Sequence, residues 1–135
     1  MKTKPMLTAD DVQRALDAAR DEAQRNGWAV TIAVVDDGGH LLGLLRLDNA
    51  APVSAMIATE KARTSALGRR ETKVYEDMIA GGRTAFLSAP LQGLLEGGVP
   101  VIVDGQVAGA IGVSGVKSDQ DAQVARAGVE AAIGG

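Results

Sequence analysis

The sequence predicts a single α+β domain, residues 1–135, in which helices flank a small and mostly antiparallel sheet of five strands. Two observations support this fold class. The order of apolar patterns along the chain is helix, two strands, a long helix, three strands and a helix. In addition, the turn sequences DDGG and DG each separate two strand-like runs, as in β-hairpins.

The composition favours a globular protein with a core of small aliphatic side chains. Hydrophobic residues make up 46% of the 135 residues and aromatic residues only 2%. No cysteine is present, which excludes disulfides and thiolate sites. The net charge of −3 and the few aromatic residues argue against a nucleic-acid partner. No segment resembles a signal peptide or approaches the ~20 apolar residues of a membrane span, so we expect a cytoplasmic protein without a membrane partner.

The first helix and the first hairpin have clear boundaries. Thr8 can cap the helix, with Asp11 placed as in a capping box, and Asn26-Gly27 ends it. Residues 28–36 (WAVTIAVVD) are apolar on both faces, which predicts a central strand covered on two sides. The DDGG turn then leads into a second strand, HLLGLLRLD.

Residues 50–70 predict a long helix with two apolar strips. Pro52 lies near its start, where proline is tolerated. The smooth strip consists of small residues and permits close packing on a sheet: Ala51, Ala55, Ala58, Ala62, Ser65 and Ala66. The bulky strip needs a partner of its own: Val53, Met56, Ile57 and Leu67. Such a helix lies between two layers or meets another subunit.

The last third of the chain predicts a short helix, three strands and a final helix. The short helix covers 72–80, and LQGLLEG (91–97) is the third strand. Residues 98–115 form the second hairpin around Asp104-Gly105. The small residues of its second arm predict close packing against a helix or a flat ligand. Ser118 is expected to cap the last helix.

Four segments together resemble the GlcG/HbpS-like family, also called the haem-degrading or PduO C-terminal-like domain family. They are VVDDGGHLLGLLRLDNA, IATEKARTSA, GGVPVIVDGQVAGAIGVSG and the helix start at Ser118–Asp121. The resemblance spans residues 7–133. It implies a profilin-like α/β/α sandwich around a five-stranded antiparallel sheet, and homo-oligomers from dimers to octamers. Some members bind haem, so it also implies a small-molecule ligand, with haem as the candidate cofactor.

His40, the only histidine, is the candidate cofactor-binding residue. Imidazole is a common ligand of haem iron. The alternative is a partly exposed turn residue, because His40 directly follows Gly38-Gly39. We expect no metal ion, since zinc prefers several histidine or cysteine ligands and this chain offers one imidazole.

Arg46 and Asp48 share one face of the second strand, about 7 Å apart by strand rise. They are candidates for an anion clamp in which Arg46 holds a carboxylate or phosphate and Asp48 orients it. The alternative is a surface ion pair on an edge strand. The family's R-x-D pattern followed by a small residue matches Arg46, Asp48 and Ala50.

Glu60 and Lys61 lie in or beside the bulky strip, where an unpaired charge is costly. Facing a pocket beside the sheet, Lys61 could bind an anion or, with a lowered pKa, act as a base. Alternatively, both residues pair across a subunit interface. The family's A-x-x-K-A-x-T-A pattern maps onto Ala58, Lys61, Ala62 and Thr64, which adds Thr64 to the ligand-binding candidates.

Gly98 and Pro100 begin the second hairpin, and Ser114 ends its paired strand. Free amides of glycines near a strand end can hold an anion, so these residues outline a polar-rimmed pocket. The alternative is that they serve only tight turns and close helix packing.

Two main functions follow. The first is a small-molecule-binding protein for haem or another flat or anionic molecule, with a pocket between the long helix and the sheet near a subunit boundary. The second is a cofactor-independent enzyme acting on a small organic acid or carbonyl compound. Lys61 would be its base, Arg46 its carboxylate clamp, and Asp48 or Glu60 its acid–base partner. A third hypothesis is an accessory subunit without a ligand.

Overall fold

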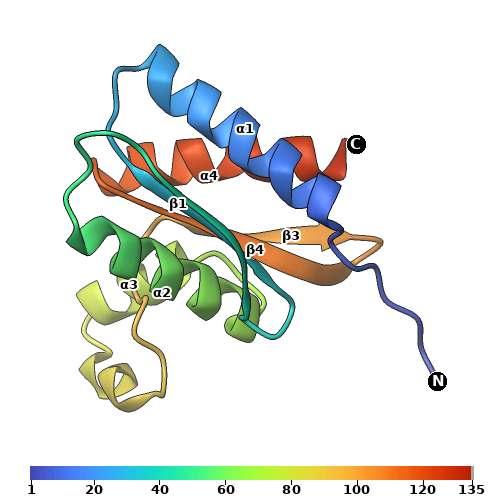
Figure 1. The fold of residues 1–135 in the computed structure, drawn as a ribbon. Coiled ribbons are helices and arrows are strands. Elements are labelled where there is room, and N and C mark those ends of the chain that lie inside the picture. Colours follow the sequence, from blue (N-terminus) through green and yellow to red (C-terminus); the bar gives the residue numbers. More distant parts are fainter. Residues whose placement is uncertain (135) are drawn as a thin grey trace.

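The structure, a computed structural model, describes residues 1–134 and has helices on both faces of an antiparallel sheet. The elements are α1 (Ala9–Arg25), β1 (Thr31–Asp36), β2 (Leu41–Arg46), α2 (Val53–Gly68), α3 (Lys73–Ala80), η1 (Thr84–Ser88), β3 (Gly98–Val103), β4 (Gln106–Ser114) and α4 (Ser118–Ile133). The strand order is β2-β1-β4-β3. Helices α1 and α4 pack together on one face of the sheet, and α2 covers the other (Figure 1). The predicted α+β class is confirmed.

The prediction of five strands is wrong, because the sheet has four. The segment predicted as the additional strand, residues 91–97, runs along α2 instead of pairing with a sheet edge. Gly93 donates its backbone N–H to the Thr64 hydroxyl at 3.0 Å. A Cβ on Gly93 would lie 2.2 Å from the carbonyl oxygen of Glu60. A short run of leucines and glycines therefore serves close contact with a helix, which its periodicity alone does not distinguish from a strand.

The helix starts agree with the prediction at α1 and differ at α4. The Thr8 side chain accepts the Asp11 N–H, while the Asp11 carboxylate accepts the Thr8 N–H at 2.8 Å, so the expected capping box is present. In α4 the predicted cap is wrong: Ser118 is the first helical residue, and Lys117 occupies the cap position. The carboxylate of Asp121 turns back to the preceding loop.

The sheet buries two different cores. The face toward α1 and α4 holds the larger aliphatic side chains, among them Ile32, Val34 and Ile111. The face toward α2 is built from small residues: Ala33, Val35, Ala58, Ala62, Ala66 and Ala110. A Cβ on Gly112 would lie 2.1 Å from the Ala58 carbonyl oxygen, so the backbone of α2 rests directly on β4. A helix, and not a flat ligand, covers this part of β4.

The bulky strip of α2 faces away from the sheet. Val53, Met56 and Leu67 are 53%, 71% and 47% exposed. No other element within residues 1–134 covers this strip, which leaves it available to a neighbouring molecule.

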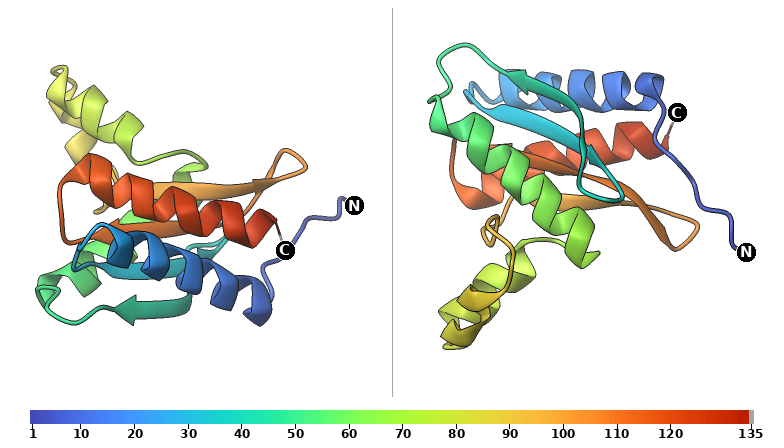
Figure 2. Two further views of the ribbon diagram at one scale, coloured as in Figure 1. Left: turned by 90° about the horizontal axis from the view of Figure 1, so that it is seen from above. Right: turned by 60° about the horizontal axis from the view of Figure 1, so that its bottom comes forward.

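Helix α3 and η1 form an arm beyond the end of α2 (Figure 2). Tyr75 is only 5% exposed and joins the arm to the body. Its ring stacks on Phe86 with the centroids 5.1 Å apart. Its hydroxyl occupies the space beside Gly68, where a Cβ would lie 1.8 Å from the oxygen. The absence of a side chain at Gly68, the last residue of α2, therefore leaves room for the Tyr75 hydroxyl.

Candidate functional site

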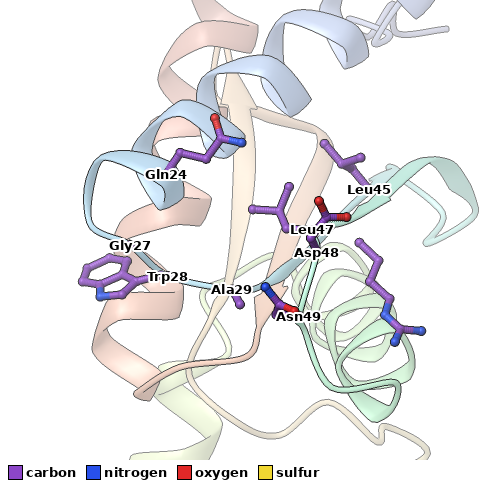
Figure 3. Close-up of a pocket in the computed structure, with 9 residues that line it drawn as sticks. Gln24, Gly27, Trp28, Ala29, Leu45, Leu47, Asp48 and Asn49 are labelled. Carbon is purple, nitrogen blue, oxygen red and sulfur yellow. The ribbon is translucent and has the colours of Figure 1, made fainter.

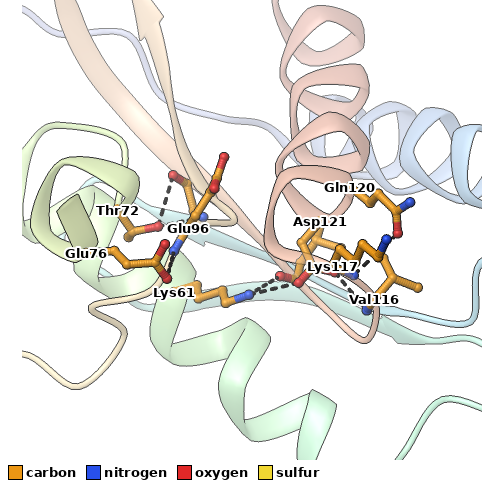
Figure 4. A network of polar contacts seen from close by, with 10 residues as sticks. Lys61, Thr72, Glu76, Glu96, Val116, Lys117, Gln120 and Asp121 are labelled. Carbon is orange, nitrogen blue, oxygen red and sulfur yellow. Dashed lines mark hydrogen bonds and ion pairs between the residues drawn. The ribbon is translucent and has the colours of Figure 1, made fainter. Parts of the chain in front are cut away.

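Lys61 of α2 and Asp121 of α4 form a buried ion pair at one end of the sheet (Figure 4). Nζ and Oδ2 are 3.0 Å apart, and both side chains are 3% exposed. Lys61 also donates to the carbonyl oxygen of Val113 at 3.0 Å, and Asp121 accepts the N–H of Val116 at 3.1 Å. The pair thus connects two helices that lie on opposite faces of the sheet.

The environment of this pair is buried and closely packed. Burial raises the pKa of the Asp121 carboxyl above its ordinary value, and the charge of Lys61 opposes that rise. Gly97 lies directly over the lysine, since a Cβ there would be 2.8 Å from Nζ. For Lys61 to reach a ligand, this ion pair and its cover would have to open.

Glu60 and Thr64, on the same helix, line a hollow of about 480 Å³ that we call the polar hollow. Arg63 lies between them in sequence and lines it too, with one guanidinium nitrogen 3.1 Å from Glu60. The remaining lining residues are Leu67, Leu87, Ala89, Pro90, Leu91 and Gln92. The polar hollow therefore lies between α2 and the chain that follows η1.

A second depression of about 550 Å³, the apolar hollow, adjoins it. The two share Leu87, Leu91 and Gln92. The other residues that line the apolar hollow are Glu76, Ile79, Ala80, Leu94 and Leu95. The apolar surface therefore continues into a surface that carries the Arg63 guanidinium, the Glu60 carboxylate and the Thr64 hydroxyl.

Arg46 and Asp48 line a separate hollow of about 380 Å³ where β2 ends, the Arg46 hollow. Gln24 and Trp28 flank one side of it, and Asp48 and Asn49 the other (Figure 3). Arg46 donates through Nε to the Ala50 carbonyl oxygen at 3.2 Å. Among the described residues Arg46 and Asp48 form no ion pair, so the alternative of a surface pair between them is wrong.

The other candidates lie apart from these hollows. His40 is exposed in the β1–β2 turn, where its backbone N–H donates to the Asp36 carboxylate at 2.9 Å. Pro100 and Ser114 are buried in β3 and β4. Gly98 is buried as well, and its amide donates to the Thr72 hydroxyl at 2.8 Å. That amide is therefore already occupied by the protein.

The structure brings some predicted residues together and separates others. Glu60 and Thr64 meet at the polar hollow, Arg46 and Asp48 at the Arg46 hollow, and Lys61 lies in neither. Arg63, which also lines the polar hollow, was not among the residues predicted from the sequence. The i, i+3 spacing of Glu60 and Arg63 was a usable signal that both charges share one edge of the helix.

Within residues 1–134, no three or more histidine, aspartate or glutamate side chains gather in a way that could hold a metal ion. In the same range, no helix combines the length and the apolar character needed to cross a membrane.

Comparison with known proteins defines the class. The model of the family described as "Haem degrading protein HbpS-like" matches residues 7–130. This chain therefore belongs to the HbpS-like family, which confirms the resemblance in its sequence. Protein GlcG of Escherichia coli (strain K12) is 61% identical over 114 residues, which cover 84% of this chain and 85% of GlcG.

Solved structures of the family share the fold. Protein ORFY of Klebsiella pneumoniae has a TM-score of 0.88 at 28% identity, covering 97% of this chain and 94% of its own. A double mutant of HbpS from Streptomyces reticuli has a TM-score of 0.85 at 35% identity, covering 96% and 88%. A complex named PduOC:Heme has a TM-score of 0.85 at 28% identity, covering 94% and 95%.

Proposed function

We propose that this protein binds a small molecule, haem or another flat anionic metabolite, in the joined polar and apolar hollows beside α2. The observation that carries the proposal is the continuity of the two hollows through Leu87, Leu91 and Gln92. An amphipathic ligand would lay its apolar body on the leucines and direct its carboxylates to Arg63. The haem complex of the PduOC neighbour supports haem as one such ligand.

The residues that line these hollows fit the propionates and the porphyrin of haem better than its iron. Arg63 suits the propionates, and Leu91, Leu94 and Leu95 suit the porphyrin. The lining residues include no histidine, methionine or tyrosine, the side chains that commonly hold haem iron. Binding in this place therefore rests on the porphyrin body and the carboxylates of the ligand.

A subunit boundary beside this site is part of the same proposal. Leu67 lines the polar hollow and belongs to the exposed bulky strip of α2 with Val53 and Met56. A neighbouring copy that covers this strip would close the hollow from outside and would exclude water from the ligand.

Titration with hemin, followed through the shift of the Soret band, tests the site. We expect Arg63→Ala to weaken binding about ten-fold or more, because a charge-assisted hydrogen bond contributes about 1.5–3 kcal/mol. Arg126→Ala is the matched control: both side chains are 47% exposed, and each pairs with a glutamate. Equal affinities of the two variants would remove Arg63 from the site.

His40→Ala separates the two locations for haem. His40 lines neither hollow beside α2. If haem binds beside α2, this variant keeps the Soret shift. If the shift disappears with His40 and persists without Arg63, haem binds at the β1–β2 turn and the proposal for the hollows fails.

A second candidate function, favoured by the Arg46 hollow, is an enzyme that acts on a small organic acid. The terminal nitrogens of Arg46 make no hydrogen bond within residues 1–134, which leaves them available to a carboxylate. Asp48 beside it would accept a proton or a hydrogen bond from the substrate. We expect small carboxylates to shift the NMR signals of residues 46–49 in the wild type and not in Arg46→Ala. Absence of any shift would count against this candidate.

A further inference from the structure

The Arg46 hollow reaches around the end of β2, from one face of the sheet to the other. Thr31, which lies opposite Arg46 in the ladder, places its hydroxyl 2.8 Å from that of Ser54 in α2. Because directly opposite residues share a face of the sheet, Arg46 leaves the strand on the α2 side. Leu45 and Leu47 lie on the opposite side and pack against the core toward α1 and α4. The hollow therefore has a cationic side and an apolar side.

Three polar side chains border the hollow beside its leucines: Gln24, Asp48 and Asn49 (Figure 3). None of these three side chains makes a hydrogen bond to another part of residues 1–134. In the polar hollow, by contrast, the charges of Glu60 and Arg63 satisfy each other at 3.1 Å. The Arg46 hollow therefore presents polar groups whose hydrogen bonds are left to water or to a ligand.

The chemistry of these three side chains favours hydroxyl groups as their partners. The Asp48 carboxylate accepts hydrogen bonds, whereas the amides of Gln24 and Asn49 both donate and accept them. A hydroxyl group also donates and accepts, so neighbouring hydroxyls can satisfy all three side chains at once. An ammonium group would suit Asp48 but would offer the amide N–H groups no acceptor. The polar border of the hollow therefore selects for a hydroxylated molecule.

We infer that the Arg46 hollow binds a sugar-like acid, with a carboxylate at one end and several hydroxyls on a compact carbon body. The carboxylate meets the terminal nitrogens of Arg46, and the hydroxyls meet Asp48 and Asn49. The C–H groups of the ligand lie on Leu45 and Leu47. This inference rests on the second candidate function, a site for a small organic acid, and adds the requirement for hydroxyls. The volume of about 380 Å³ leaves room for such a molecule.

The backbone at Asn49 permits a variant that removes its amide without disturbing the turn. Asn49 has a left-handed backbone, with φ of 71°. Glycine adopts this conformation without steric cost, so Asn49→Gly keeps the turn and removes only the side chain. Asp104, in the β3–β4 turn, has the same kind of backbone, with φ of 51°, and lies outside the hollow. Asp104→Gly is therefore the matched control.

The fluorescence of Trp28, the only tryptophan of the chain and a lining residue of the hollow, reports binding to the full chain. Three probes with rings of the same size are compared: glucuronate, cyclohexanecarboxylate, which lacks the hydroxyls, and glucose, which lacks the carboxylate. We expect glucuronate to bind about ten-fold or more tighter than either of the others. Asn49→Gly should reduce its preference over cyclohexanecarboxylate about five-fold, and Asp104→Gly should leave that preference unchanged.

Each contrary result has its own meaning. Equal affinities for glucuronate and cyclohexanecarboxylate would overturn the inference about hydroxyls and leave the organic-acid candidate standing. Equal affinities for glucuronate and glucose would remove Arg46 as the carboxylate partner, and the candidate would fail as well. No response to any probe, checked through the indole N–H signal of Trp28 in NMR spectra, would overturn both. A preference that Asn49→Gly and Asp104→Gly reduce equally would place the hydroxyl contacts outside this hollow.

Discussion

Lys61 and Asp121 lie 60 positions apart in the chain, yet their charged groups meet at 3.0 Å with almost no contact with solvent. The lysine comes from the helix on one face of the sheet and the aspartate from a helix on the other. Because each charge would be costly without its partner, the pair requires α2 and α4 to be placed together.

Removal of one member of this pair should destabilise the protein strongly. We expect Lys61→Met to lower the free energy of unfolding by about 3–5 kcal/mol, because Asp121 is left buried and unpaired. The double variant Lys61→Met/Asp121→Leu should recover part of this loss. Urea denaturation measures both, and Arg63→Ala, which breaks an exposed pair, serves as the control at about 0–1 kcal/mol. A cost of Lys61→Met no larger than the control's would show that the pair is weak.

The capping box of α1 predicts a pH-dependent contribution to stability. The hydrogen bonds from the backbone and side chain of Thr8 lower the pKa of Asp11 below its ordinary 3.8. The contribution of Asp11 is therefore complete above pH 3.8 and is lost as the pH falls through the lower folded-state pKa. We expect Asp11→Ala to cost about 0.3–1.5 kcal/mol at neutral pH and progressively less in acid, as for the loss of one capping interaction. Asp10→Ala, without such bonds, should show little of this trend in thermal unfolding at graded pH.

Gly93 should tolerate no side chain. A Cβ there would lie 2.2 Å from a backbone carbonyl of α2, so Gly93→Ala must displace residues 91–95. We expect a loss of about 1–3 kcal/mol in the free energy of unfolding, together with weaker hemin binding, because this segment walls both hollows. Gly38→Ala is the control, since its Cβ would meet only side-chain atoms, of the exposed His40 at 3.3 Å and of Asp36 at 3.5 Å. Similar stabilities of the two variants would mean that the segment is loosely held.

Tyr75 should account for much of the attachment of the α3–η1 arm. Tyr75→Ala removes a buried ring that stacks on Phe86, and we expect it to cost about 3–5 kcal/mol in denaturant unfolding. Tyr75→Phe keeps the ring and should cost about 1 kcal/mol or less. If Tyr75→Ala were equally mild, the arm would be held by other contacts.

The local patterns of the sequence predicted most of the fold. The capping residues Thr8 and Asp11, the two hairpin turns and the alanine strip of α2 are each encoded within a few neighbouring residues. The error at residues 91–97 has a definite cause. Their glycines are spaced for contact with α2, and only the three-dimensional arrangement shows which backbone they approach.

The site was harder to predict for the same reason. The cost of a buried charge correctly drew attention to Lys61, but nothing local points to a partner in the last helix. The polar hollow depends on where residues 87–92 cross α2, a tertiary relation that no spacing within the helix contains. Arg46 and Asp48 share a hollow because they are two residues apart in sequence, although β2 ends at Arg46 and Asp48 lies in the turn that follows, not on the strand as predicted.

The direct contact of the α2 backbone with β4 at Gly112 limits how this protein can move. Where side chains separate a helix from a sheet, a change of rotamers lets the helix slide or tilt. Here no such intervening layer exists, so helix and sheet must travel as one stiff body. Any conformational change on ligand binding is then expected in the α3–η1 arm and in the segment that follows it, residues 89–95. Mobility measured by NMR relaxation should therefore concentrate in residues 73–95 and leave α2 rigid.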